Sequence, residues 1–194
     1  AMIGKDAFQE SDIIGMANPV VKYAFQPRTP GEVPEMVKKG FYIAETGRPG
    51  PVLIDVPKDV QQNESPMEFP EEFKIQGYHP WYDPDMVACE KAIEMLLNSE
   101  KPIILAGGGT IISSAFAELQ SIAETLMIPV VTTFKGKGAF PENHPLSLGP
   151  IGMHGHAEAN KMMAEADCVL AIGTRFSDRS VGTFEAFEKR LKII

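Results

Sequence analysis

Three consecutive glycines, Gly107, Gly108 and Gly109, are the first residues whose type and spacing suggest chemistry. They directly follow the apolar run 102–106, and backbone amides in a turn that leads into a helix can approach a phosphate closely. The last glycine of the dinucleotide fingerprint is absent, because position 112 is Ile112. A tight turn from a strand into a helix, with no ligand, explains the three glycines about equally well.

Basic side chains follow two later apolar runs. Lys135 and Lys137 stand among glycines, where they either neutralise an anion or lie in solvent. Arg175 and Arg179 come after the other run, and two guanidinium groups at a strand end suit a phosphate or a carboxylate. The purely structural alternative is an ion pair between Asp178 and Arg179.

A fourth segment, residues 152–156, carries His154 and His156 one residue apart. A His-x-His pair can begin a metal site, but no Asp, Glu or Cys at ligand spacing accompanies it, so we expect no metal there. The sequence also lacks a serine elbow, a Walker loop and a zinc pattern. The residue patterns alone therefore lead only as far as a nucleotide-binding α/β unit.

These segments need a scaffold, and from residue 84 onward the sequence alternates between helical and strand patterns. Expected helices are 84–97, 113–126 and 155–165, and expected strands are 102–106, 129–133, 168–173 and 191–194. We expect a long loop between the second strand and residue 153. Such alternation predicts an α/β fold: an open, Rossmann-like parallel sheet with flanking helices and right-handed crossovers. Ligands bind beyond the carboxyl ends of the strands in such sheets.

Helical spacing predicts a buried face for the first of these helices, formed by Met86, Cys89, Ile93, Leu96 and Leu97. The two cysteines, Cys89 and Cys168, lie far apart in apolar segments. We expect both to be buried thiols in a reducing compartment, with no disulfide framework.

Residues 1–60 predict the C-terminal part of a second α/β domain. A strand is expected at 20–25, and a helix from the capping box that starts at Thr29. An apolar strand at 51–57 is bracketed by prolines, as expected for a buried parallel strand. Residues 61–83 are polar and rich in proline, which predicts an extended linker to the domain at 84–194.

The composition excludes several classes of protein. Of 194 residues, 44% are hydrophobic and 23% are charged, which is ordinary for a globular protein. The net charge of −8, without a basic cluster, predicts that no nucleic acid is a partner. No apolar run reaches the ~18 residues of a membrane helix and no secretory signal is visible, so we expect a cytoplasmic protein that does not enter a membrane.

Taken in order, five motifs resemble the acetolactate synthase (acetohydroxyacid synthase) large-subunit family of thiamine-diphosphate enzymes. They are residues 6–10, 47–60, 107–109, 152–155 and 175–179. The resemblance implies the end of a pyrimidine-binding domain at 1–60 and most of a central, FAD-binding-type domain at 84–194. It also implies that thiamine diphosphate and Mg²⁺ bind mostly outside these residues, so that the chain alone is inactive.

The family condenses two pyruvates, or pyruvate and 2-oxobutyrate, with loss of CO2. The products are 2-acetolactate and 2-aceto-2-hydroxybutyrate, on the path to branched-chain amino acids. Members are homo-oligomers, and some carry a regulatory small subunit. Two other interpretations stay open: another thiamine-diphosphate enzyme, of the pyruvate oxidase or glyoxylate carboligase type, or a stand-alone, non-catalytic nucleotide-binding module.

The resemblance also implies residue roles. Phe8 and Gln9 are expected against the reacting centre and Lys58 along the substrate channel. Arg179, held by Asp178, is expected to bind the carboxylate of the acceptor 2-oxo acid, beside an apolar wall formed by Met153. The residues expected to contact or flank FAD are Arg48, Gly107, Gly108, Gly109, Thr133, Gly152, Met153, His154, Gly173, Arg175, Asp178 and Arg179.

Two segments depart from the family pattern. Residues 135–138 read Lys-Gly-Lys-Gly where many members have an apolar Met-Gly-Leu-Gly, and Ser177 stands where an aspartate is common. Because of the first departure, we do not count on flavin contacts at residues 135–138. The resemblance also implies that the chain ends before the strand and loop that would hold the adenosine end of FAD, so FAD binding by this chain alone is expected to be weak or absent.

Overall fold

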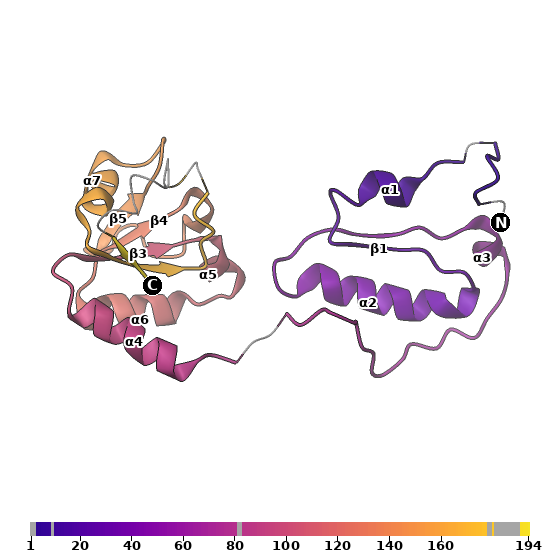
Figure 1. Cartoon of the computed structure of the whole chain (residues 1–194), viewed down its shortest axis with the longest axis horizontal. Helices are drawn as coiled ribbons and strands as arrows, with labels where there is room; N and C mark the ends of the chain where they lie inside the picture. The colour runs from indigo at the N-terminus through magenta and orange to yellow at the C-terminus, as the bar shows by residue number, and fades with distance from the viewer. Residues whose placement is uncertain (1–2, 9, 81–82, 178–179, 181–190) are drawn as a thin grey trace. The chain divides into compact units, whose positions relative to one another are not determined.

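The computed structural model describes residues 3–8, 10–80, 83–177, 180 and 191–194. The chain divides into two compact units, Ala1–Asp83 and Pro84–Ile194, which are drawn in Figure 1 and described separately below. Among the described residues, no helix combines the length and the apolar character needed to cross a membrane.

The second unit is built on a parallel sheet. Its strands are β3 (Pro102–Ala106), β4 (Val130–Thr132), β5 (Ser147–Pro150), β6 (Cys168–Ile172) and β7 (Lys192–Ile193). They lie in the order β5-β4-β3-β6-β7, and every neighbouring pair is parallel. The predicted open parallel α/β sheet is confirmed.

Helices cover both faces of this sheet. On one face lie α4 (Met86–Leu97) and α6 (Phe116–Leu126), and on the other lies α7 (Ala157–Glu165) (Figure 1). Alternate residues of β3 enter the two cores: Ile104 packs with Leu119 of α6, and Leu105 packs with Met163 of α7. This alternation is the two-residue period of a strand with both faces buried.

Two elements of this unit differ from the prediction. Strand β5 forms within the stretch expected to be a loop, where Ser147, Gly149 and Pro150 give no strand signal. The helix expected at 113–126 begins only at Phe116, and a short helix that was not expected, α5 (Gly108–Ile112), precedes it; Ser114, in a left-handed conformation with φ of 56°, separates the two helices.

The predicted buried face of α4 is wrong. Of its five residues only Leu96 is buried, whereas Met86 and Leu97 are 63% and 64% exposed and Ile93 is 39% exposed. Cys89 is exposed as well, so only Cys168 is the buried thiol that was expected. Helical spacing identifies an apolar stripe but cannot tell whether a neighbouring element covers it.

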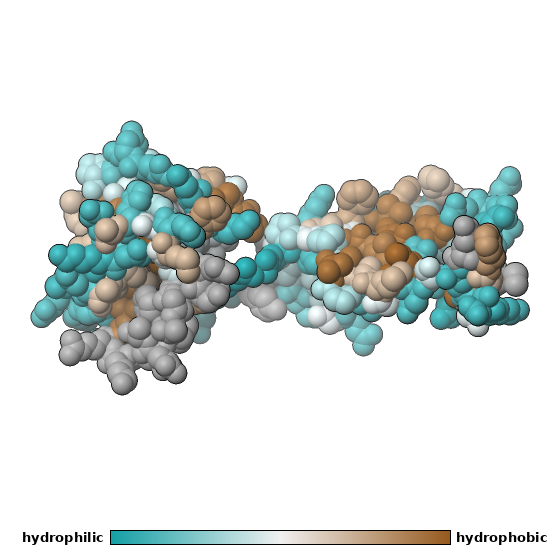
Figure 2. Space-filling model, turned by 90° about the horizontal axis from the view of Figure 1, so that it is seen from above, coloured by the Kyte–Doolittle hydropathy of each residue, from teal (hydrophilic) through white to brown (hydrophobic). Residues whose placement is uncertain are grey.

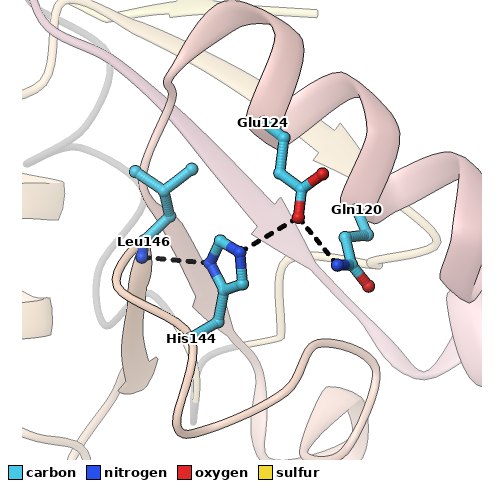
Figure 3. A network of polar contacts seen from close by, with 4 residues as sticks. All are labelled: Gln120, Glu124, His144 and Leu146. Atoms are coloured by element: carbon cyan, nitrogen blue, oxygen red, sulfur yellow. Dashed lines mark hydrogen bonds and ion pairs between the residues drawn. The ribbon is translucent and has the colours of Figure 1, made fainter.

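A polar network ties α6 to the segment before β5 (Figure 3). The His144 ring accepts a hydrogen bond at Nδ1 from the Leu146 amide (3.2 Å), and its Nε2 lies 3.1 Å from Glu124 Oε1. Gln120 Nε2 donates to the same carboxylate oxygen at 2.7 Å. The histidine also packs edge-on against the buried ring of Phe140, with centroids 4.9 Å apart.

The first unit holds a two-stranded parallel sheet of β1 (Tyr23–Phe25) and β2 (Val52–Ile54). Its helices are α1 (Ile13–Ala17), α2 (Val33–Glu45) and α3 (Lys58–Gln62), and a 3-10 turn η1 (Pro30–Glu32) precedes α2. Helix α2 lies close against β2 at Gly40, where a Cβ atom would be 3.2 Å from the Ile54 side chain.

The expectation of a buried strand at 51–57 is not met, because the residues of β2 are only half-buried. Figure 2 shows apolar side chains gathered on the face of this unit opposite α2. Large exposed apolar residues of the α1–β1 region are Ile13, Met16, Val20 and Tyr23. In the described part of the chain, α2 therefore covers one face of the small sheet while much of the other stays accessible.

The capping box predicted at Thr29 also forms differently. The Thr29 side chain makes no capping hydrogen bond, and the Glu32 carboxylate accepts from the Arg28 amide (2.9 Å) instead of the Thr29 amide. The cause is the 3-10 turn that opens α2, which pairs the Glu32 amide with the Thr29 carbonyl at 3.2 Å. In α4 the cap is Asp85, whose Oδ1 accepts from the Val87 and Ala88 amides.

Residues 63–80 contain no helix or strand, yet they pack on the first unit. The Tyr78 hydroxyl lies 2.9 Å from Thr46 Oγ1 and accepts from Lys22 Nζ at 3.2 Å. The Tyr42 ring meets Phe73 edge-on, with centroids 5.4 Å apart. Although this segment has no regular secondary structure, Tyr78 and Phe73 attach it to the unit that precedes it.

Candidate functional site

The carboxyl ends of the second unit's strands form the candidate site. The chain leaves β3 toward β4 on one side of the sheet and leaves β6 toward β7 on the other, so the connections diverge between β3 and β6. In open parallel sheets, the crevice outside such a divergence is the usual place for a ligand. The loops after β3 and β6 are those with the glycine and arginine motifs.

The glycine triplet packs directly on the loop after β6. The amide of Gly107 donates to the Ile172 carbonyl and that of Gly109 to the Gly173 carbonyl, both at 2.8 Å. A Cβ atom on Gly107 would lie 2.3 Å from the Gly173 oxygen, and one on Gly109 would lie 2.6 Å from the Gly173 Cα. Two of the three amides expected to face a phosphate therefore bond to the neighbouring loop, and the glycines permit that backbone contact.

The loop after β4 is hydrogen-bonded to the end of β3. The Thr133 amide donates to the Ala106 carbonyl (2.9 Å), and the buried Thr133 hydroxyl accepts from the Gly136 amide (3.0 Å). Gly136 in turn lies so close to β3 that a Cβ atom would be 2.2 Å from the Ala106 oxygen. Thr133 thus shapes its own loop, while Phe134 is 78% exposed and Lys135 is also exposed.

The loop after β5 is likewise hydrogen-bonded to the end of β4, because the Ile151 amide donates to the Thr132 carbonyl at 2.9 Å. Gly152, with φ of 104°, is held on both sides of its backbone by one side chain. Its amide donates to Asn160 Oδ1 (2.9 Å), and its carbonyl accepts from Asn160 Nδ2 (3.0 Å). Met153 and His154 follow, the first 75% exposed and the second also exposed.

The two histidines of this loop have different surroundings. His156 precedes α7 and directs Nδ1 toward the Leu148 carbonyl at 3.3 Å, against the face of Gly149. His154 is exposed on the loop. Within the described ranges, no three His, Cys, Asp or Glu side chains are grouped closely enough to hold a metal ion.

Of the three charged residues predicted to bind ligands in the loop after β6, the structure describes only Arg175. Arg175 is exposed in the loop after β6, where the Phe176 amide donates to Thr174 Oγ1 at 3.4 Å. Asp178 and Arg179, the predicted acceptor-binding pair, lie outside the described residues, as does Gln9. Phe8, Arg48 and Lys58 are exposed side chains of the first unit, Phe8 to 94%.

The side chains along this edge have the chemistry that a flavin dinucleotide needs. Arg175 and Lys135 are exposed cations that suit a diphosphate, and the exposed Phe134 and Met153 are apolar surfaces that suit an aromatic ring. The exposed side chains therefore fit such a ligand. The amides of Gly107 and Gly109 do not, because both are already hydrogen-bonded within the protein.

Sequence reasoning missed Asn160. Its amide reaches back eight residues to Gly152, and that pairing depends on the turn between β5 and α7. An asparagine near the start of a helix gave only a weak signal.

Comparison with known proteins identifies the fold. Residues 89–194 match the family model described as thiamine pyrophosphate enzyme, central domain. This chain belongs to that family. A solved structure described as a "putative thiamin diphosphate-dependent enzyme isolated from Mycobacterium smegmatis" has the same fold, with a TM-score of 0.68 and 24% identity. The match covers 84% of this chain and 31% of that one.

Relatives match the entire chain, including its first unit. A protein of Methanocaldococcus jannaschii named "Probable acetolactate synthase large subunit" is 49% identical over 196 residues, covering 100% of this chain and 33% of the relative. The acetolactate synthase large subunit of Corynebacterium glutamicum is 42% identical over 193 residues, covering 100% and 31%. That of Haemophilus influenzae is 42% identical over 195 residues, covering 100% and 34%. The chain spans about a third of the length of these relatives, and the resemblance to acetolactate synthase large subunits is confirmed.

Proposed function

We propose that this chain is part of the large subunit of an acetolactate synthase. In the proposed reaction, two pyruvates, or pyruvate and 2-oxobutyrate, condense with loss of CO2 in branched-chain amino acid biosynthesis. The observation that carries the proposal is identity of 42% to 49% with named large subunits along the full chain. A stand-alone nucleotide-binding module would not be expected to share residues 1–83 with them.

Thiamine diphosphate would supply the carbanion chemistry by which a 2-oxo acid loses CO2 and attacks a second one. We propose that this cofactor and Mg²⁺ bind mainly to parts of the large subunit outside this chain. In support, this chain spans only about a third of the length of the large subunits that it matches. From this chain, Phe8 and Gln9 would contribute an apolar ring and an amide to the reacting centre, and Lys58 an ammonium group to the substrate channel.

The acceptor 2-oxo acid carries a carboxylate, which a guanidinium group binds through two parallel hydrogen bonds. We assign this role to Arg179, with Asp178 holding the guanidinium and Met153 as an apolar wall beside the acceptor. Support for Met153 comes from its 75% exposure at the carboxyl edge of the sheet.

For FAD, the side chains of Met153, His154 and Arg175 are proposed to make the contacts. We assign a structural role, that of holding the loops after β3 and β6 together, to Gly107, Gly109 and Gly173. Gly108, Gly152 and Thr133 would shape the backbone beneath the ligand. Assembly of the large subunit as a homo-oligomer, a regulatory small subunit and a cytoplasmic location belong to the same proposal.

The test uses the full-length large subunit with pyruvate, thiamine diphosphate and Mg²⁺. The expected product is 2-acetolactate, measured as acetoin after acid decarboxylation, with release of one CO2 per product. Parallel assays measure peroxide and acetyl phosphate from pyruvate with phosphate and O2, and tartronate semialdehyde from glyoxylate. Peroxide and acetyl phosphate in place of acetolactate would overturn the proposal in favour of a pyruvate oxidase. Tartronate semialdehyde in its place would do so in favour of a glyoxylate carboligase.

A further inference from the structure

Asn160 makes an unusual pair of hydrogen bonds for an exposed side chain. Its Oδ1 accepts from the Gly152 amide at 2.9 Å and its Nδ2 donates to the Gly152 carbonyl at 3.0 Å. Both polar atoms of the side chain are thus directed at one residue of the preceding loop. Asn160 itself is exposed on α7, so this pairing lies outside the buried core.

The pairing adds to a backbone hydrogen bond within the loop, in which the Gly152 carbonyl also accepts from the Gly155 amide at 2.9 Å. The loop is tied at its beginning by Ile151 to the Thr132 carbonyl and at its end by His156 to the Pro150 carbonyl. Between these points Gly152 adopts a φ of 104°, where peptide orientation is not restricted by a side chain. The two hydrogen bonds from Asn160 restrain the peptide groups on both sides of Gly152 by linking them to α7.

The residues that follow this fixed peptide face solvent. Met153 is 75% exposed, and keeping a large apolar side chain in water on a restrained loop has no benefit for folding. His154 is exposed beside it. A restrained backbone with projecting side chains is the arrangement expected where contact with a ligand must be made in one geometry.

We propose that Asn160 is a positioning residue, which orients Met153 and His154 toward the ligand at the carboxyl edge through the Gly152 peptide. This inference rests on the proposed function, in which that ligand is FAD. Asn160 does not touch the flavin in this account, because both of its amide atoms are engaged with Gly152.

The experiment compares three variants of the full-length protein with the wild type. Asn160→Ala removes both hydrogen bonds, and Asn160→Asp keeps an acceptor for the Gly152 amide but loses the donor to its carbonyl. Lys161→Ala is the matched control, since Lys161 is the next exposed residue of α7 and takes no part in the hydrogen bonds between Asn160 and Gly152. The dissociation constant of FAD is measured by quenching of flavin fluorescence, and the Tm of each apoprotein is measured alongside.

We expect Asn160→Ala to raise the Kd for FAD about tenfold, the effect of two hydrogen bonds of ordinary net strength. Asn160→Asp should fall between Ala and wild type, and Lys161→Ala should bind FAD as the wild type does. Because the two hydrogen bonds form within the folded chain, the apoprotein Tm of Asn160→Ala should fall by a few degrees. The Kd values are therefore compared at a temperature at which every variant is fully folded, where a merely structural role would leave the Kd for FAD unchanged. In turnover, we expect a raised requirement for added FAD with kcat unchanged once FAD is saturating.

A Kd for FAD within twofold of wild type in Asn160→Ala, at a temperature at which both are fully folded, would overturn the inference. If the wild type makes acetolactate without binding FAD, the inference fails while the proposed function stands. If the wild type binds FAD and makes no acetolactate, the proposed function fails, and the effect of Asn160 on flavin binding still decides the inference.

Discussion

Asp167, just before β6, and Lys101, just before β3, hydrogen-bond to each other in both directions. The Lys101 amide donates to Asp167 Oδ1 at 2.9 Å, and the Asp167 amide donates to the Lys101 carbonyl at 3.3 Å. The second carboxylate oxygen accepts from the Glu100 amide at 2.8 Å. This contact holds two central strands together at the end of the sheet opposite the candidate site.

Stability in acid should depend on Asp167. Hydrogen bonds from the Glu100 amide, and then from the Lys101 amide, hold the pKa of this carboxyl below its usual value. Because the folded pKa is depressed, the stabilisation is complete above the unfolded pKa of about 3.9 and is lost as pH falls through the folded pKa. Asp167→Ala should reduce the free energy of unfolding by about 1.5–3 kcal/mol at pH 7 and by less near pH 2.

Urea unfolding followed by circular dichroism at both pH values measures this effect. Glu90→Gln, an exposed carboxylate of α4, is the control and should change the free energy of unfolding little at either pH. An equal loss at pH 7 and pH 2 in Asp167→Ala would show that the charge of the carboxylate is not involved.

Replacement of His144 should weaken the attachment of α6 to the start of β5 (Figure 3). His144→Ala removes the acceptor of the Leu146 amide and the ring contact with Phe140, and we expect a loss of about 1–3 kcal/mol in thermal or urea unfolding. Gln120→Ala removes only the outer hydrogen bond to Glu124 and should cost less than about 1 kcal/mol. Equal losses in the two variants would contradict this account.

The two cysteines should differ in reactivity. Cys89 is exposed on α4, whereas Cys168 is fully buried and burial raises its thiol pKa. In the folded 194-residue chain, an aromatic disulfide reagent should therefore modify one thiol rapidly, and the second only on unfolding. Cys89→Ser should abolish the fast phase, and persistence of that phase would disprove the assignment.

The contact between the loops after β3 and β6 should not tolerate a side chain at Gly107. The Cβ of Gly107→Ala would lie 2.3 Å from the Gly173 oxygen, so the backbone must move, and we expect a loss of about 1–3 kcal/mol. Gly31→Ala is the matched control, because its Cβ would meet only the Ser65 hydroxyl, at 3.2 Å, which can rotate away. Calorimetry of both variants makes the comparison, and similar melting temperatures would contradict the prediction.

The sequence was a good guide where long apolar runs specify an element. Strand β3 begins and ends where it was predicted, and β6 does so to within one residue, because each is a continuous run buried on both faces. Strand β5 could not be predicted, since its four residues include Gly149 and Pro150 and it forms only because β4 offers an edge.

The site was predictable in its location but not in its contacts. A glycine triplet after a strand is compatible with amides that face a phosphate or a neighbouring loop, and only the position of Gly173 decides between them. The roles of α4's apolar residues and of Asn160 likewise depend on neighbours that helical spacing does not reveal.

The close approach of Gly107 and Gly109 to Gly173 has a consequence for redesign. Because no side chains separate them, the loops after β3 and β6 form one rigid backbone surface. The distance between the two loops cannot increase without breaking the hydrogen bonds that join them. A protein engineer seeking to alter which molecule docks at this edge should leave the glycines untouched. Ligand selectivity should instead be changed by substituting exposed side chains of the loops at this edge, beginning with Arg175 and Lys135.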